Sequence, residues 1–205
     1  MAFRCNCIEV FCQKEGANST NRPSKTGIHT QTISIIHQNV QSLGNSIDKL
    51  EQLLLDNPDC SILCITEHWN SKEQICQLGL KNFKLAASMC REIGKHGGSA
   101  IFLKNNINAK ECEFISNLST FGEFECSAIQ CEVNKLKMII VSVYRPPNGS
   151  IEVFFEKLEC LLFEKIESNS TIFLGGDFNI EMKEDNVTKN RKNTQELNNS
   201  DSNDS

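Results

Sequence analysis

The run Phe173-Leu174-Gly175-Gly176-Asp177-Phe178-Asn179 constrains the fold most strongly, because an apolar strand ends there in a carboxylate and an amide two residues apart. Strand side chains alternate between faces, so we expect Asp177 and Asn179 to point the same way. The two glycines let the backbone turn and let a ligand approach closely. The run predicts a phosphate and metal site at a sheet edge of an α/β fold. A turn rich in Asn and Asp that caps a buried strand is the alternative.

Length and composition favour one domain with tails. The chain has 205 residues, of which 39% are hydrophobic and 23% charged, and this is enough for a sizeable core. A net charge of -5 argues against a general binder of polyanions, because nonspecific affinity for DNA depends on Lys and Arg. Any contact with nucleic acid should therefore be local and assisted by a metal ion.

The cysteine pattern and the hydropathy pattern favour an intracellular protein. Eleven cysteines are scattered through strand-like and helix-like segments, so we interpret them as mostly reduced, buried thiols. No apolar run reaches the roughly 18 residues of a membrane span, and the start of the chain lacks the apolar segment of a secretory signal. We expect a nuclear or cytoplasmic protein that is not secreted.

Three regions follow from the pattern along the chain. Residues 1–31 are polar and predict a flexible N-terminal arm, residues 32–182 predict the folded domain, and residues 183–205 are so polar that we expect a disordered tail. The domain begins with a strand at 33–40, a helix from 45 or 46 to 57 and a strand at 61–66, which is the unit that makes a parallel pair with a right-handed crossover. Further strands are predicted at 83–87, 99–103, 124–133, 138–144 and 171–174, with helices at 71–80 and 151–167.

Polar side chains stand at four of the predicted strand ends. They are Asn39, the pair Glu67-His68, the pair Tyr144-Arg145, and Asp177 with Asn179. Each alone has a structural explanation, such as a turn cap, a solvated end or a rim residue. Their joint appearance favours a functional site.

Five motifs in order extend this interpretation. They are His37-Gln38-Asn39-Val40-Gln41-Ser42-Leu43, Thr66-Glu67-His68-Trp69, Gly97-Gly98-Ser99-Ala100-Ile101-Phe102, Val143-Tyr144-Arg145-Pro146-Pro147-Asn148 and Gly175-Gly176-Asp177-Phe178-Asn179. Together they resemble the endonuclease/exonuclease/phosphatase superfamily, and within it the apurinic-type endonuclease domain of non-LTR retrotransposons. The resemblance implies a two-sheet α/β sandwich of the α+β type. It also implies Mg²⁺-dependent cleavage of phosphodiesters, with Mn²⁺ as a possible substitute, and DNA as partner, without a membrane or an obligate protein partner.

The resemblance also implies roles for individual residues. Glu67 matches the family's metal-binding glutamate, and Asn39 matches an asparagine at the metal and phosphate. Tyr144 matches the tyrosine that faces the scissile phosphate, Asp177 the aspartate that orients or deprotonates water, and Asn179 its partner at the phosphate. Arg145 and Asn148 lie in a loop that approaches DNA in the family.

The sequence departs from the family after Asn179, where nothing resembles its closing Ser-Asp-His motif. All four histidines precede Asp177, and we interpret His68 as a solvated neighbour of Glu67. We therefore expect an incomplete copy of the sandwich, with one apolar sheet face exposed and with weak or absent activity. Two alternatives stay open: a phosphatase of the same superfamily for phosphoinositides or other small phosphoesters, and a noncatalytic module that binds DNA or protein.

Overall fold

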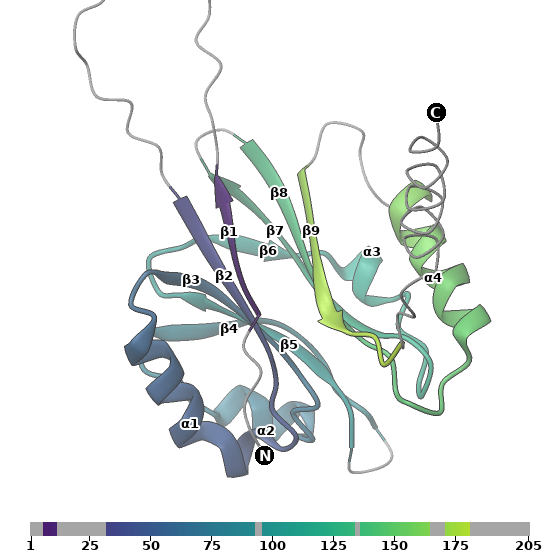
Figure 1. Ribbon diagram of the computed structural model, residues 1–205, viewed down its shortest axis with the longest axis horizontal. Helices are drawn as coiled ribbons and strands as arrows, with labels where there is room; N and C mark the ends of the chain where they lie inside the picture. The colour runs from purple at the N-terminus through teal and green to yellow at the C-terminus, as the bar shows by residue number, and fades with distance from the viewer. Residues whose placement is uncertain (1–5, 12–31, 93–95, 134–135, 165–170, 181–205) are drawn as a thin grey trace, which may run out of the picture.

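Two β-sheets lie face to face in the computed structural model, with helices outside them (Figure 1). The structure describes residues 6–11, 32–92, 96–133, 136–164 and 171–180. Within these ranges no helix is both long and apolar enough to cross a lipid bilayer. The predicted tail at 183–205 lies outside the described residues.

The first sheet has five strands in the order β1-β2-β3-β5-β4. They are β1 (Asn6–Phe11), β2 (Thr32–Asn39), β3 (Cys60–Thr66), β4 (Phe83–Met89) and β5 (Ser99–Lys104). β2 and β3 are parallel and are joined by α1 (Leu43–Asp56), as the sequence predicted, while the other pairs are antiparallel. The short helix α2 (Lys72–Gln77) follows β3.

The second sheet has four strands in the order β6-β7-β8-β9. They are β6 (Ala109–Glu111), β7 (Glu125–Val133), β8 (Leu136–Tyr144) and β9 (Thr171–Asp177). β7 and β8 form the expected antiparallel hairpin, whereas β9 runs parallel to β8 after the crossover helix α4 (Ile151–Glu164). A short helix, α3 (Glu113–Ser116), follows β6.

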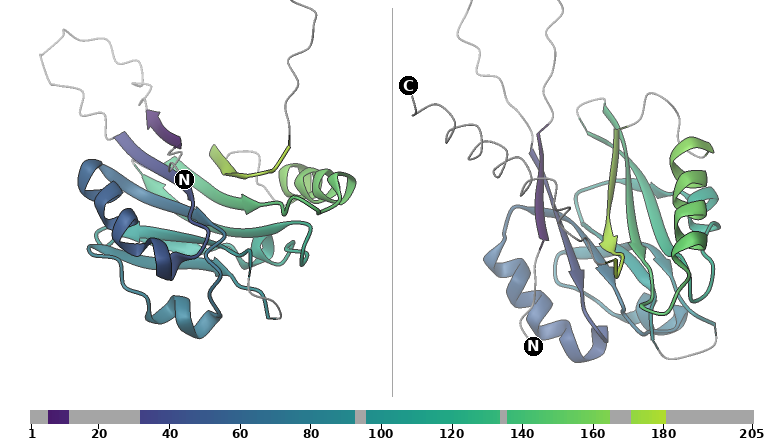
Figure 2. Two further views of the ribbon diagram at one scale, coloured as in Figure 1. Left: turned by 60° about the horizontal axis from the view of Figure 1, so that its bottom comes forward. Right: turned by 45° about the vertical axis from the view of Figure 1, so that its right-hand side comes forward.

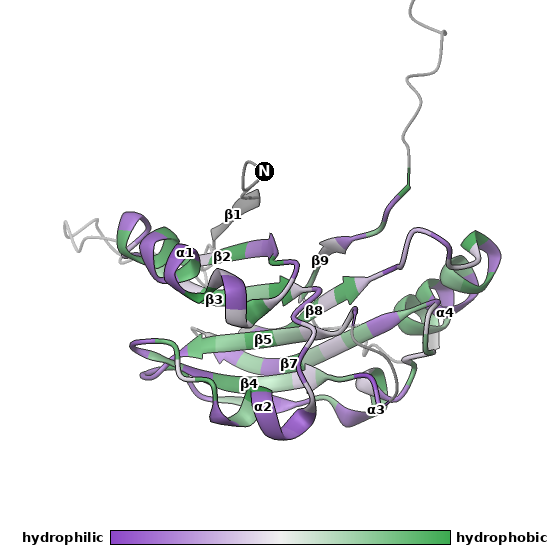
Figure 3. Cartoon of the chain, turned by 90° about the horizontal axis from the view of Figure 1, so that it is seen from below, coloured by the Kyte–Doolittle hydropathy of each residue, from purple (hydrophilic) through white to green (hydrophobic). Residues whose placement is uncertain are grey.

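Three apolar clusters show that the sandwich is packed on every face. One lies between the two sheets, one between the first sheet and α1 and α2, and one between the second sheet and α3 and α4. The views in Figure 2 and the hydropathy colouring in Figure 3 show this layering. The expectation of an exposed apolar sheet face is therefore wrong for the described residues, because the inner faces pack on each other and helices pack on the outer faces. Exposed apolar side chains lie instead on helices and in a loop, among them Leu55 on α1, Phe121 and, on α4, Phe163, which is 79% exposed.

Several element boundaries differ from the prediction. α1 begins at Leu43, after Ser42 in a left-handed conformation (φ 86°). Ser46 does not cap the helix but lies within it, and its hydroxyl donates to the Val40 carbonyl at 2.8 Å. β1 falls within the region that we expected to be a flexible arm, and its pairing with β2 satisfies its backbone. β6 and α3 were not predicted, since neither is long enough to show a period.

Candidate active site

The ends of four strands meet at one end of the sandwich. Asn39 ends β2 and pairs with Thr66, the last residue of its parallel neighbour β3. In the second sheet, Tyr144 lies between Glu125 and Asp177 in the strand register. Because β2 and β3 are parallel and β8 and β9 are parallel, each pair carries its final side chains to the same edge.

The Asn39 amide joins the two sheets at this end. Its Nδ2 donates to Glu67 Oε1 at 2.7 Å and to Asp177 Oδ2 at 2.6 Å, across sequence separations of 28 and 138 residues. The Asn39 Oδ1 accepts from the backbone N–H of Gln41 at 3.2 Å. One oxygen of Glu67 and one of Asp177 therefore lie within two hydrogen-bond lengths of each other. The structure thus brings these three predicted residues together.

Strained backbone surrounds Glu67. Positive φ angles occur at Gln41 (43°), Ser42 (86°), Glu67 (57°) and Trp69 (59°), and each costs about 1–3 kcal/mol for a residue other than glycine. Backbone hydrogen bonds hold the segment from both sides: Ser42 N–H donates to the Glu67 carbonyl at 2.9 Å, and Glu67 N–H donates to the Gly98 carbonyl at 2.8 Å. Such strain collects at functional sites, where the surroundings fix a conformation that the chain alone would not adopt.

Tyr144 is buried beside Glu67, with 4% of its surface exposed. Burial raises the pKa of its phenol, and the charge of Glu67 and a hydrogen bond to that carboxylate raise it further. Tyr144 therefore stays protonated at neutral pH and acts as a hydrogen-bond donor.

Asn179 reaches the site by a turn and not by strand alternation. β9 ends at Asp177, and Asn179 is left-handed (φ 47°). Its N–H donates to Asp177 Oδ1 at 3.3 Å, and its side-chain Nδ2 donates to the Arg145 carbonyl at 2.8 Å. The sequence left open a functional site or a capping turn at this run. The structure has an Asx-type turn, and the carboxylate of that turn is the one that meets Glu67 at Asn39.

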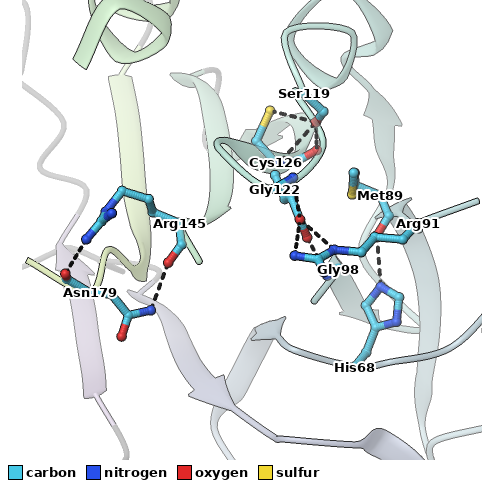
Figure 4. A network of polar contacts seen from close by, with 10 residues as sticks. His68, Met89, Arg91, Gly98, Ser119, Gly122, Cys126, Arg145 and Asn179 are labelled. Atoms are coloured by element: carbon cyan, nitrogen blue, oxygen red, sulfur yellow. Dashed lines mark hydrogen bonds and ion pairs between the residues drawn. The ribbon is translucent and has the colours of Figure 1, made fainter. Parts of the chain in front are cut away.

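Arg145 has a structural place in this turn (Figure 4). It is 3% exposed, and its guanidinium donates to the carbonyls of Phe178 at 2.7 Å, Gly149 at 2.5 Å and Asn179. With these donors directed at backbone carbonyls, Arg145 holds the β9 turn in place. Its contact with DNA stays a prediction. Asn148, in the same loop, is exposed.

A buried ion pair, which sequence reasoning missed, joins Glu125, the strand partner of Tyr144 on β7, to Arg91, which Figure 4 labels. Glu125 is 0% exposed, and its carboxylate lies 2.5 Å from the Arg91 guanidinium. It also accepts from Gly98 N–H at 2.6 Å, and the Gly98 carbonyl holds Glu67 N–H. In the sequence, the signal for this ion pair was a single carboxylate, Glu125, at the start of an apolar strand.

Two histidines are buried near the site. Burial lowers the pKa of His37 to about 4, although the nearby Asp177 carboxylate acts in the opposite direction. His68 is 1% exposed, and its ring accepts from Asn70 N–H at 3.0 Å and lies 2.9 Å from the Met89 carbonyl. The interpretation of His68 as a solvated neighbour is wrong, because its ring links the Glu67 segment to the end of β4.

Two glycines of the motifs are required by packing. A Cβ on Gly98, which has a φ of 89°, would overlap the His68 ring. A Cβ on Gly176 would overlap the backbone carbonyl of Val143 on the neighbouring strand. Both positions need glycine for the close approach that brings Glu67 and Asp177 together.

The donor set fits a hydrated Mg²⁺ ion. Carboxylate oxygens are its preferred protein ligands, and one or two of them suffice because the ion keeps several waters. Glu67 and Asp177 converge on one NH₂ group, that of the Asn39 side-chain amide, at the place where a cation would offset both negative charges. Within the described residues no group of three or more His, Cys, Asp or Glu side chains is placed to hold a metal ion.

Comparison with solved structures identifies the fold. The endonuclease domain of TRAS1, a telomere-specific non-LTR retrotransposon, superposes with a TM-score of 0.54 and 14% identity over 80% of this chain and 69% of that one. TDP2 of D. rerio, complexed with a single-strand DNA product, gives 0.55 and 15% over 77% and 64%. An endonuclease/exonuclease/phosphatase family protein from Leptotrichia buccalis gives 0.52 and 14% over 80% and 74%.

The chain thus spans about two thirds of the length of the first two structures. No family model matches the sequence, and no curated protein matches it. The matches in structure confirm the sandwich that the motifs predicted. This chain has the fold of the endonuclease/exonuclease/phosphatase proteins.

Proposed function

We propose that the chain is a Mg²⁺-dependent phosphodiester hydrolase that nicks DNA, of the retrotransposon endonuclease type. One observation carries the proposal: the Asn39 amide hydrogen-bonds both Glu67 and Asp177 across the two sheets. A pair of carboxylates beside neutral donors can supply the general base and the charge stabilisation that catalyse hydrolysis of a phosphodiester. The likeness to the TRAS1 endonuclease domain supports the same reaction class.

Each residue has a role that follows from its contacts. Glu67 would hold the metal ion, which supplies Lewis-acid polarisation of the phosphate when bound. Asn39, whose NH₂ group donates to Glu67 and Asp177, would position these carboxylates for the ion. Asp177 orients the attacking water and takes the proton of that water. The Asn39 side-chain amide and the Asn179 backbone N–H fix the position of the Asp177 carboxylate. Tyr144 is kept protonated by burial and by Glu67. Its single O–H would turn from Glu67 to a phosphate oxygen as the charge on that oxygen grows.

We propose that turnover by the 205-residue chain is slow. The printed sequence contains no Asp-His pair after Asn179, and His37, which lies near Asp177, is neutral above a pKa of about 4. Burial lowers the pKa of His68 as well, so neither of the two histidines buried near the site supplies a cationic imidazole to stabilise charge on the phosphate at neutral pH.

Nicking of supercoiled plasmid tests the function. We expect slow nicking with Mg²⁺ or Mn²⁺, none in EDTA, and none above background for Asp177→Ala. Glu132→Ala is a matched control, because Glu132 is an exposed carboxylate on β7. Metal-independent nicking, or equal nicking by Asp177→Ala, refutes the proposed site, and fast nicking refutes the slow turnover. Release of phosphate from an inositol phosphate, without cleavage of DNA, would favour the phosphatase alternative.

A further inference from the structure

A second hollow adjoins the proposed cleavage site. It has a volume of about 500 Å³, and its lining includes Ser42, Trp69, Asn70, Arg91, His96 and Gly97. We call it the Trp69 pocket. None of the roles proposed above uses it.

The Trp69 pocket and the carboxylate site share one segment of chain. Trp69 follows Glu67 by two residues, so their Cα atoms are at most about 7.6 Å apart. The segment is fixed on both sides, since Leu43 N–H donates to the His68 carbonyl at 3.0 Å and Trp69 N–H donates to the Gly97 carbonyl at 3.1 Å. One wall of the pocket therefore begins beside the backbone of Glu67.

One wall of the pocket is aromatic. The rings of Trp69 and His96 meet edge to face, with centroids 4.3 Å apart and an interplanar angle of 86°. In this arrangement the edge of one ring covers one face of the other ring. The remaining ring faces are left for stacking with the ring of a ligand. His96 is exposed at the mouth, where a planar ligand would enter.

The charges of the lining favour a neutral ligand over a phosphate. The Arg91 guanidinium is already neutralised by Glu125 at 2.5 Å, and the Glu92 carboxylate also lines the hollow. An anion placed here would meet no uncompensated positive charge among these groups.

Unused hydrogen-bonding groups lie in the same wall. Trp69 Nε1 and Asn70 Oδ1 are shielded from solvent and have no hydrogen-bond partner in the described part of the chain. One is a donor and the other an acceptor, and a nucleobase edge offers both complements. A base that these side chains turned to meet would satisfy groups that are otherwise unpaired.

We propose that the Trp69 pocket takes the base of a nucleotide next to the scissile phosphate, turned out of the DNA stack onto the Trp69–His96 pair. The position of that phosphate rests on the proposed function, while the pocket itself rests on its own residues. Cleavage would then favour unpaired or easily distorted DNA, because turning out a base costs least there.

The fluorescence of Trp69 reports directly on this pocket, because it is the only tryptophan in the chain. The probes are a single-stranded DNA octamer and a set of octamers with one abasic position each, titrated into the wild type in EDTA so that nothing is cleaved. We expect a saturable change in fluorescence and, for one abasic position, a loss of affinity on the order of tenfold.

Two variants locate the effect. His96→Ala removes half of the aromatic wall at an exposed position and should weaken binding by a similar factor. Phe163→Ala is the control, since it removes an exposed aromatic ring from α4 on the outer face of the second sheet and should leave binding unchanged.

The outcomes separate the two proposals. A fluorescence change that is the same for a fully abasic octamer, or that His96→Ala does not alter, overturns the pocket even if the chain nicks DNA. Absence of any change in fluorescence overturns it as well. A base-dependent change in a chain that never nicks DNA retains the pocket and refutes the nuclease.

Discussion

The buried Glu125–Arg91 pair gives the sharpest test of how the site is held. Glu125→Gln keeps the shape of the side chain but replaces one acceptor oxygen with an N–H₂ group. The carboxylate is 0% exposed and accepts from Arg91 Nε at 2.7 Å, Gly98 N–H at 2.6 Å and Gly122 N–H at 3.3 Å. In the variant at least one of these donors faces another donor, and the Arg91 charge loses its partner.

The expected cost is large for a protein of this size. Breaking a buried pair by changing one partner costs about 3–5 kcal/mol, whereas whole domains have free energies of unfolding of about 5–15 kcal/mol. At about 2–4 °C per kcal/mol, the melting temperature should fall by about 6–20 °C. Urea unfolding, followed by circular dichroism and by Trp69 fluorescence, measures the loss.

Matched variants make the result decisive. Glu132→Gln, at an exposed position on the same strand, should change stability by less than about 0.5 kcal/mol. The double variant Arg91→Met/Glu125→Leu should lose less than the two single variants combined, because it leaves no unpaired charge. A loss below about 1 kcal/mol for Glu125→Gln would show that water enters and replaces the pair, contrary to the burial argued here.

Three further predictions concern the packing, the titration and the chemistry of the site. Gly176→Ala should destabilise the chain strongly through overlap with Val143, whereas Gly44→Ala, with no atom within 4 Å of the added Cβ, should be neutral or stabilising in urea unfolding; equal midpoints would contradict this. His37 has a folded pKa of about 4 against 6.5 unfolded, so the unfolded chain binds the extra proton below pH 6.5 and stability should fall by about 3 kcal/mol as pH drops from 6.5 toward 4. His37→Gln should flatten that dependence, and an unchanged slope would exclude His37 as its source. Tyr144→Phe should slow metal-dependent nicking on the order of a hundredfold, and an unaltered rate would remove Tyr144 from the mechanism.

Local signals in the sequence were sufficient for most of the fold. The β-branched run before Asn39, the helical spacing that follows it and the apolar strand before Glu67 predicted the parallel β2–α1–β3 unit, because each element has its own period. The position of Asp177 at the end of a strand was predicted for the same reason. Short pieces such as β6 and α3 have no period, so only their tertiary contacts define them.

The sequence by itself determined which chemical groups end the strands: an amide at Asn39, carboxylates at Glu67 and Asp177, and a phenol at Tyr144. Only the tertiary structure decided what each of them contacts. It directed the Arg145 guanidinium inward to backbone carbonyls, buried His68 and placed Glu125 behind Tyr144. The physical reason is that residue type and spacing fix local conformation, whereas burial and hydrogen-bond partners arise from segments as far apart as Asn39 and Asp177, which meet only when the two sheets pack.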